Sequence, residues 1–129
     1  LSLSHIHIHI LQEVEGEKTE ITTMSFADRI LVVVSQTGRM GPMVLASKDL
    51  SGMNSTPSYT IKSLSGNTFE HDPIPQLFAR RLVAEIGKST DRPLLVSLSL
   101  GGKCKDATEA SILKTIKELV PMVLKCLNN

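Results

Sequence analysis

Residues 29–47 read RILVVVSQTGRMGPMVLAS and decide the fold. Their aliphatic run, Ile30–Val34, is apolar at every position, which predicts a central strand over residues 29–36 that is covered on both faces. A tight turn bracketed by Gly38 and Gly41 follows, and residues 42–47 return as a further strand. Because Pro42 has no backbone N–H, this strand should begin there or lie at a sheet edge.

The residues before this stretch alternate between polar and apolar side chains, as strands do. Residues 5–10 read HIHIHI, residues 15–17 form a turn, and residues 19–26 are rich in β-branched side chains. This pattern predicts a β-hairpin. We expect its isoleucines to face the covered side of the sheet and its histidines to face water.

The residues after it supply a fifth strand, residues 58–64, and then a first helix. Asp72 is the expected N-cap, with Pro73 at the first helical position and Gly87 at the end. The apolar stripe of this helix comprises Ile74, Leu77, Phe78, Leu82 and Ile86.

Residues 93–100 are a sixth strand, and a second helix opens at Asp106. Pro121 should kink or restart that helix. The order βββββαβα predicts an α+β fold, with a roughly six-stranded antiparallel sheet (a meander first) and two helices packed on one face. The chain, residues 1–129, is expected to form a single domain.

Two helices leave the other face of the sheet without cover. That face carries Leu31, Val33 and Leu95, or Ile30, Val32 and Val34 in place of the first two. Because exposed apolar patches usually mark protein interfaces, we expect a second layer from another subunit. A β-sandwich closed within the chain is the alternative.

Composition excludes several classes of partner. A net charge of +1 and an aromatic fraction of 3% provide neither a basic footprint nor stacking platforms for nucleic acid. The longest apolar run, Ile30–Val34, is too short to span a membrane, and no secretory signal is recognisable. Only two cysteines, Cys104 and Cys126, indicate a reducing compartment, with Cys126 in or near the core.

Catalytic motifs are missing from the sequence, and no cofactor is expected. Serines are frequent, but none stands in a GxSxG elbow. Residues 101–103 read GGK, without the rest of a phosphate-binding loop. An enzyme with a pocket near these residues and His71 is therefore the weakest of three hypotheses.

The histidines His5, His7 and His9 support a second hypothesis, a small metal-binding protein. Histidines at alternate strand positions share a face, and two of them can chelate zinc. The first and third lie about 13–14 Å apart, too far for one ion. The same residues could instead be part of a purification tag or the polar outer face of a strand, and we favour the strand face.

Three stretches carry a family resemblance. Residues 25–47 contain the aliphatic strand and the turn SQTGRMG, residues 71–86 read HDPIPQLFARRLVAEI, and residues 92–100 read RPLLVSLSL. Together they resemble the proteasome assembly chaperone 3 family, from about Thr19 to the end of the chain.

This resemblance implies a non-catalytic role in ordering α-subunits into the ring of the 20S core particle. It implies pairing with a chaperone 4-like protein or with a second copy, and a cytoplasmic location with the nucleus as a further compartment. A partner's sheet would then cover Leu31, Val33 and Leu95. Exposure and chemistry suggest Arg39, Met40, Arg80 and Arg81 as contacts with partners.

Overall fold

The structure is a computed structural model that describes residues 6–14, 16–49, 58–64, 73–101 and 109–127. Its elements in chain order are β1 (Ile6–Val14), β2 (Glu17–Ser25), β3 (Ile30–Ser35), β4 (Met43–Asp49), β5 (Ser58–Ser63), α1 (Ile74–Ile86), β6 (Leu94–Ser99) and α3 (Glu109–Leu127). The predicted α+β fold is confirmed, with six strands and two helices in the described chain.

The sheet is mixed rather than antiparallel throughout. Its strand order is β1-β2-β3-β6-β4-β5, and β3 pairs with β6 in parallel while the other neighbours are antiparallel. The prediction of a five-strand meander was therefore wrong, because β6 inserts between β3 and β4. Four of the six residues of β6 are buried (Leu94, Val96, Ser97 and Leu98), as expected of a strand at the centre of the sheet.

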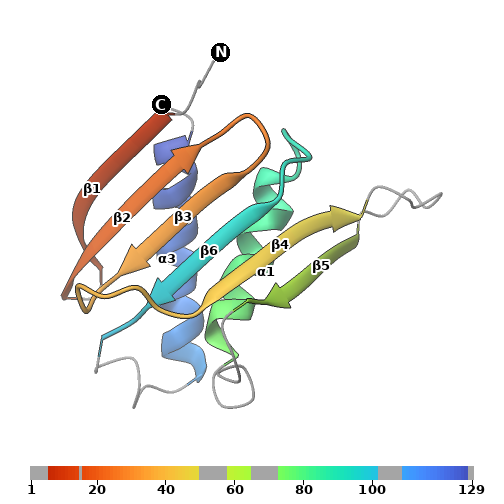
Figure 1. Cartoon of the computed structure of the whole chain (residues 1–129). Coiled ribbons are helices and arrows are strands. Elements are labelled where there is room, and N and C mark those ends of the chain that lie inside the picture. Colours follow the sequence, from red (N-terminus) through yellow and green to blue (C-terminus); the bar gives the residue numbers. More distant parts are fainter. Residues whose placement is uncertain (1–5, 15, 50–57, 65–72, 102–108, 128–129) are drawn as a thin grey trace.

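Both helices pack on one face of the sheet, and the face turned to the viewer in Figure 1 carries no helix of the described chain. α1 lies against β4, β5 and β6, and α3 lies against β1 and β2. The core between the layers is aliphatic, with Phe78 as its one fully buried aromatic side chain among the described residues. Its largest buried side chains are Phe78, Ile21, Leu82, Leu94, Ile116, Leu119, Val14, Val32, Val34, Val44, Val83 and Val96.

The first helix begins one residue later than predicted. Pro73 takes the N-cap position without a side-chain hydrogen bond, and its carbonyl accepts the first helical bond, from Leu77 N–H at 3.1 Å. Asp72 lies outside the described residues. Leu77 was predicted to face the core, but 40% of its surface is exposed, because Phe78 and Pro75 take the buried positions. The helix ends at Gly87 as predicted.

The second helix runs as one element through Pro121, so of the two outcomes predicted there, a kink or a restart, the restart is wrong. Pro121 is exposed, whereas Val120 and Val123 beside it are buried. The proline ring therefore lies outside the core and displaces none of the buried side chains beside it. The predicted cap at Asp106 lies outside the described residues.

The β1–β2 hairpin confirms the expected orientation of its side chains where they are described. Ile8 and Ile10 pack against the core from the helix-covered side, and His9 is exposed. Gly16 has a φ of 80° in the turn between the strands.

Candidate protein-interaction site

The open face of the sheet carries a cluster of apolar side chains. Cross-strand partners share a face, and one row across four strands pairs Met24 with Leu31, Leu31 with Leu95, and Leu95 with Leu45. The neighbouring row adds Val33 and Met43. All six side chains keep part of their surface in solvent. We call Met24, Leu31, Val33, Met43, Leu45 and Leu95 the open-face cluster.

The three residues predicted for a dimer face, Leu31, Val33 and Leu95, all lie in this cluster. The alternative set in β3, Ile30 and its alternate neighbours, is buried under the helices instead. The prediction left out Met24, Met43 and Leu45. The alternation of Met43 and Leu45 with buried Val44 in the sequence was a usable signal.

One end of this face is closed by the turn between β3 and β4, which side chains hold in place. Ser35 Oγ donates to the carbonyl of Arg39 at 2.8 Å, and the Thr37 and Ser99 hydroxyls are hydrogen-bonded at 2.6 Å. Ser97 Oγ donates to the carbonyl of Gly41 at 3.1 Å. These hydrogen bonds hold the loop in one conformation.

Two glycines make this turn possible for different reasons. Gly38 has a φ of 76°, which lies in the left-handed region, with open space around its Cα. Gly41 instead lies against β6, where a Cβ would stand 2.0 Å from the carbonyl oxygen of Leu98. The turn therefore presents Arg39 and Met40 outward; Met40 is 61% exposed.

The amide of Gln36 ties this end of the sheet together. It donates through Nε2 to Thr19 Oγ1 at 3.1 Å and accepts through Oε1 from Gly101 N–H at 2.8 Å. Gly101 is buried and has a structural place beside β2. Residues 102–108, including the rest of the GGK stretch and Cys104, lie outside the described chain, as does His71.

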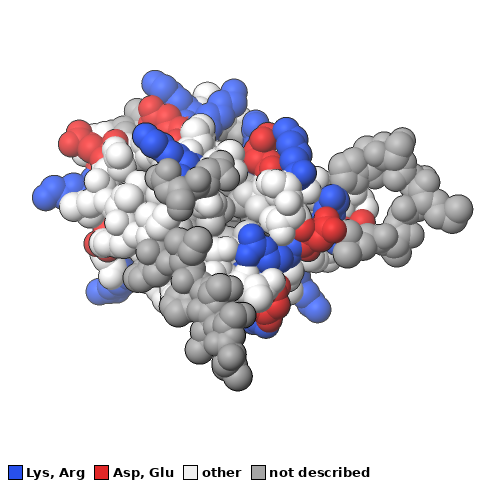
Figure 2. Space-filling view, turned by 90° about the horizontal axis from the view of Figure 1, so that it is seen from above, with Lys and Arg blue, Asp and Glu red and all other residues white. Residues whose placement is uncertain are grey.

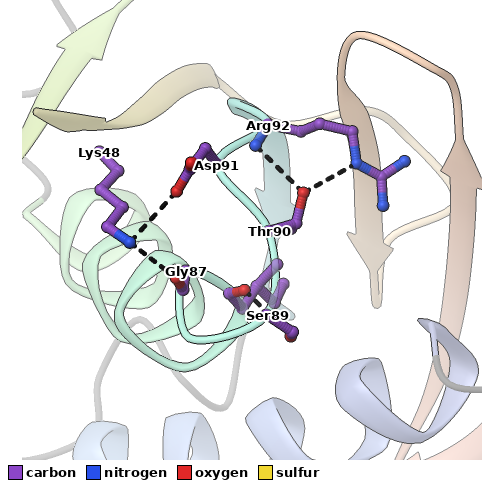
Figure 3. Close-up of polar contacts among 7 residues, drawn as sticks. Lys48, Gly87, Ser89, Thr90, Asp91 and Arg92 are labelled. Carbon is purple, nitrogen blue, oxygen red and sulfur yellow. Dashed lines mark hydrogen bonds and ion pairs between the residues drawn. The ribbon is translucent and has the colours of Figure 1, made fainter. Parts of the chain in front are cut away.

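At the opposite end of β6, a polar network joins the loop after α1 to the sheet (Figure 3). Lys48 Nζ donates to the carbonyl of Gly87 at 3.1 Å and contacts Asp91 Oδ1 at 3.2 Å. Arg92 donates through Nε to Thr90 Oγ1 at 3.1 Å.

The same arginine reaches the β2–β3 turn, where its Nη1 donates to Ser25 Oγ at 2.9 Å and to the carbonyl of Phe26 at 2.6 Å. Arg92 also borders a hollow of about 380 Å³. Because its Nε and Nη1 groups donate within the chain, we assign this network to the fold. The sequence alone did not reveal it.

The remaining predicted contact residues, Arg80 and Arg81, lie on α1 in the helix layer. Both side chains are exposed. The structure therefore does not bring the four predicted partner contacts together: Arg39 and Met40 belong to the β3–β4 turn.

The histidine hypothesis gains no support from the described residues. His9 Nε2 lies 3.4 Å from Glu20 Oε2, and about half of each side chain is exposed. His5 and the side chain of His7 lie outside the description. Within the described chain, no three His, Cys, Asp or Glu side chains are grouped as metal ligands would be.

Of the two cysteines, only Cys126 lies within the described residues. It is buried near the end of α3, as predicted. Burial raises the pKa of its thiol, and the positive charge of Lys125 opposes this shift. The thiol is therefore protonated at neutral pH, which makes it a poor nucleophile.

Surface charge is mixed. On the side seen in Figure 2, positive and negative side chains are interspersed rather than gathered into one basic patch. Buried side-chain polar atoms of the described residues all have partners. No helix in the described part of the chain is long and apolar enough to cross a membrane.

Several known proteins are similar to this chain in sequence. A family model described as Proteasome assembly chaperone 3 matches residues 32–121. The Bos taurus protein of that name is 32% identical over 97 residues, 74% of this chain and 77% of the bovine one. The Mus musculus and Homo sapiens proteins of that name are each 30% identical over 107 residues, 81% of either chain.

Among solved structures, the chain resembles one in the "Crystal Structure of a Novel Chaperone Complex for Yeast 20S Proteasome Assembly". The TM-score is 0.54 and the identity 19%, over 96% of this chain and 93% of the yeast one. At that identity the likeness shows a shared fold.

Proposed function

The chain belongs to the proteasome assembly chaperone 3 family, and on that premise we propose that it is a non-catalytic chaperone subunit in assembly of the 20S α-ring. It acts in the cytoplasm and the nucleus as a dimer with a chaperone 4-like protein. A second copy of the chain takes that place when the partner is missing. No cofactor takes part.

The observation that carries this proposal is the open-face cluster. Its six side chains come from four adjacent strands: Met24, Leu31, Leu95 and Leu45 form one continuous row, and Val33 and Met43 lie beside it on either side of Ser97. Burying a Leu, Val or Met side chain completely contributes about 1.5–3 kcal/mol relative to full exposure. Since these side chains are already partly covered, several must be covered together to stabilise a dimer.

A second sheet is the cover that fits this surface. Two sheets pack face to face at about 10 Å, and their apolar side chains interdigitate. Such stacking leaves α1 and α3 on the outside of the dimer, where they do not obstruct it. A helical partner would fill the surface less evenly than a strand layer, whose side chains repeat with the same spacing.

We assign contact with the α-subunits to the β3–β4 turn. Met40 is a flexible apolar side chain held outward on a fixed loop, and Arg39 places a cation beside it. Preorganised loops lose less conformational entropy on binding, and Met and Arg are enriched at protein interfaces.

The test of the dimer is co-expression of the tagged chain with the chaperone 4-like partner of the same organism, followed by capture. The wild type should retain the partner in equal amount. Leu95→Arg places a charge in the middle of the open-face cluster and should abolish retention. Circular dichroism and a thermal melt of the captured chain check that each variant is folded.

Leu77→Arg is the matched control, because Leu77 is a partly exposed leucine on the helix side. It should retain the partner as the wild type does. Retention by Leu95→Arg, or loss with folded Leu77→Arg, would overturn the placement of the dimer on the open face.

Contact with α-subunits is tested by capture of the seven recombinant α-subunits on the preformed dimer. Met40→Asp and Arg39→Glu should each lower capture while the dimer stays intact. Arg29→Glu, an exposed arginine in the β2–β3 turn, is the control and should not. Equal capture by all three variants would remove the β3–β4 turn from the proposal.

A further inference from the structure

A small hollow lies between the two helices on the side away from the open-face cluster. It encloses about 180 Å³, and its lining residues are Leu77, Arg80, Arg81, Ala84, Leu113 and Ile116. Four of these six are apolar. The small side chain of Ala84, on α1, leaves room beside Leu113 and Ile116 on α3. We call this hollow the interhelical groove.

The rim of the groove is positively charged. Arg80 and Arg81 line it from α1, and both are exposed. Neither side chain forms a hydrogen bond or ion pair with a residue that the structure describes. On α3, exposed Lys117 stands four positions after Leu113, on the same side of the helix. Two cations, Arg80 and Arg81, thus line the apolar hollow, and Lys117 adds positive charge on the same side of α3.

No acidic side chain of the described residues forms an ion pair with Arg80 or Arg81. Glu85, on the turn after Arg81, is engaged with Lys88 at 3.2 Å. Glu118 stands five positions after Leu113, about 140° around the helix axis. Guanidinium groups without a partner can bind carboxylates, and an apolar hollow between them can hold an apolar side chain that those carboxylates flank.

We propose that the interhelical groove binds an acidic segment of a partner protein that inserts one leucine-sized side chain between α1 and α3. The volume suits a single aliphatic side chain rather than a helix face or a second copy of the whole domain. Arg80 and Arg81 bind the flanking carboxylates in bidentate fashion, which lysine does less well.

This site does not depend on the dimer proposed above. The groove lies in the helix layer, and the open-face cluster lies on the other side of the sheet. A partner can therefore occupy the groove whether or not the open face is covered. Failure of either proposal leaves the other unaffected.

The test is a titration of the ¹⁵N-labelled full chain with the acetylated, amidated peptide EDLDE, followed by amide chemical shifts. Saturable shifts should be confined to the amides of the groove residues. The peptide EDSDE carries the same charge without the leucine and should bind about tenfold more weakly. Arg80→Glu and Arg81→Glu should each weaken EDLDE binding by roughly fivefold or more.

Two further variants separate charge from fit. Arg29→Glu changes the net charge by the same amount elsewhere on the surface and should leave the affinity within about twofold. Ala84→Phe fills the groove without touching a charge and should abolish the leucine dependence. Shifts spread over all basic residues, equal binding of the two peptides, equal effects of Arg29→Glu and Arg81→Glu, or no shift at millimolar peptide would each overturn the proposal.

Discussion

The two faces of the sheet are built from the same strands but differ in what covers them. In β3, Val32 and Val34 point toward the helices and are fully buried, whereas Leu31 and Val33 point the other way and remain partly exposed. Both sets are equally apolar, so composition does not separate them. The covered side stabilises the monomer, whereas the open side has apolar surface that the described residues leave partly exposed and that, in our proposal, a second molecule buries.

The sharpest test of this contrast uses two adjacent leucines of β6. Leu94 is fully buried under the helices, and Leu95 belongs to the open-face cluster. Leu94→Ala should lower the free energy of unfolding by about 2–5 kcal/mol, because it removes core contacts and leaves a cavity. Leu95→Ala should cost about 1 kcal/mol or less in the monomer. Urea unfolding at low protein concentration measures both changes in unfolding free energy. Equal losses would show that the two faces of β6 do not differ in burial.

The β3–β4 turn extends the comparison of the two faces, because its residues belong neither to the core under the helices nor to the open-face cluster. Gly41→Ala forces a Cβ against the backbone carbonyl of Leu98 and should cost about 3 kcal/mol. Gly38→Ala meets no atom and only strains a left-handed backbone, so it should cost about 1 kcal/mol. Urea unfolding of the two variants gives the ranking, and a larger loss for Gly38→Ala would contradict the packing of Gly41 on β6.

A smaller effect concerns the thiol on the covered side. Because burial raises the pKa of Cys126, the folded state holds its proton more tightly than the unfolded state. This contribution to stability is complete below the ordinary cysteine pKa of about 8.5 and is lost as pH rises through the raised value. In a Cys104→Ser background, Cys126→Ala should therefore flatten the fall in unfolding free energy above that pH. Identical pH profiles for the two chains would show that the thiol is not desolvated.

Local patterns in the sequence predicted the strands and helices because alternation and helical spacing are short-range signals. The choice of buried side in β3 followed from where the helices pack, which the alternation left open between Leu31 and Ile30. The insertion of β6 between β3 and β4 was missed, because pairing between distant strands leaves no local trace.

The hydrogen-bond networks of Gln36 and Arg92 could not be predicted from the sequence either. The contacts of Gln36 with Thr19 and Gly101, and of Arg92 with the β2–β3 turn, join segments far apart in the sequence. The interhelical groove depends on how α1 and α3 pack, so the sequence marked Arg80 and Arg81 only as exposed cations. Open-face residues were partly predictable, since Leu31, Val33 and Leu95 alternate with buried neighbours.

The central claim is that a partner covers the open face, and a thiol placed there tests it most directly. Leu95→Cys in the Cys104→Ser background is alkylated with iodoacetamide and followed by mass spectrometry, with buried Cys126 as the slow internal reference. In the diluted chain alone, the introduced thiol should react readily. In complex with the chaperone 4-like partner, its rate should fall roughly tenfold or more while that of Cys126 stays unchanged. An unchanged rate in a complex shown to be intact by sedimentation would contradict the account.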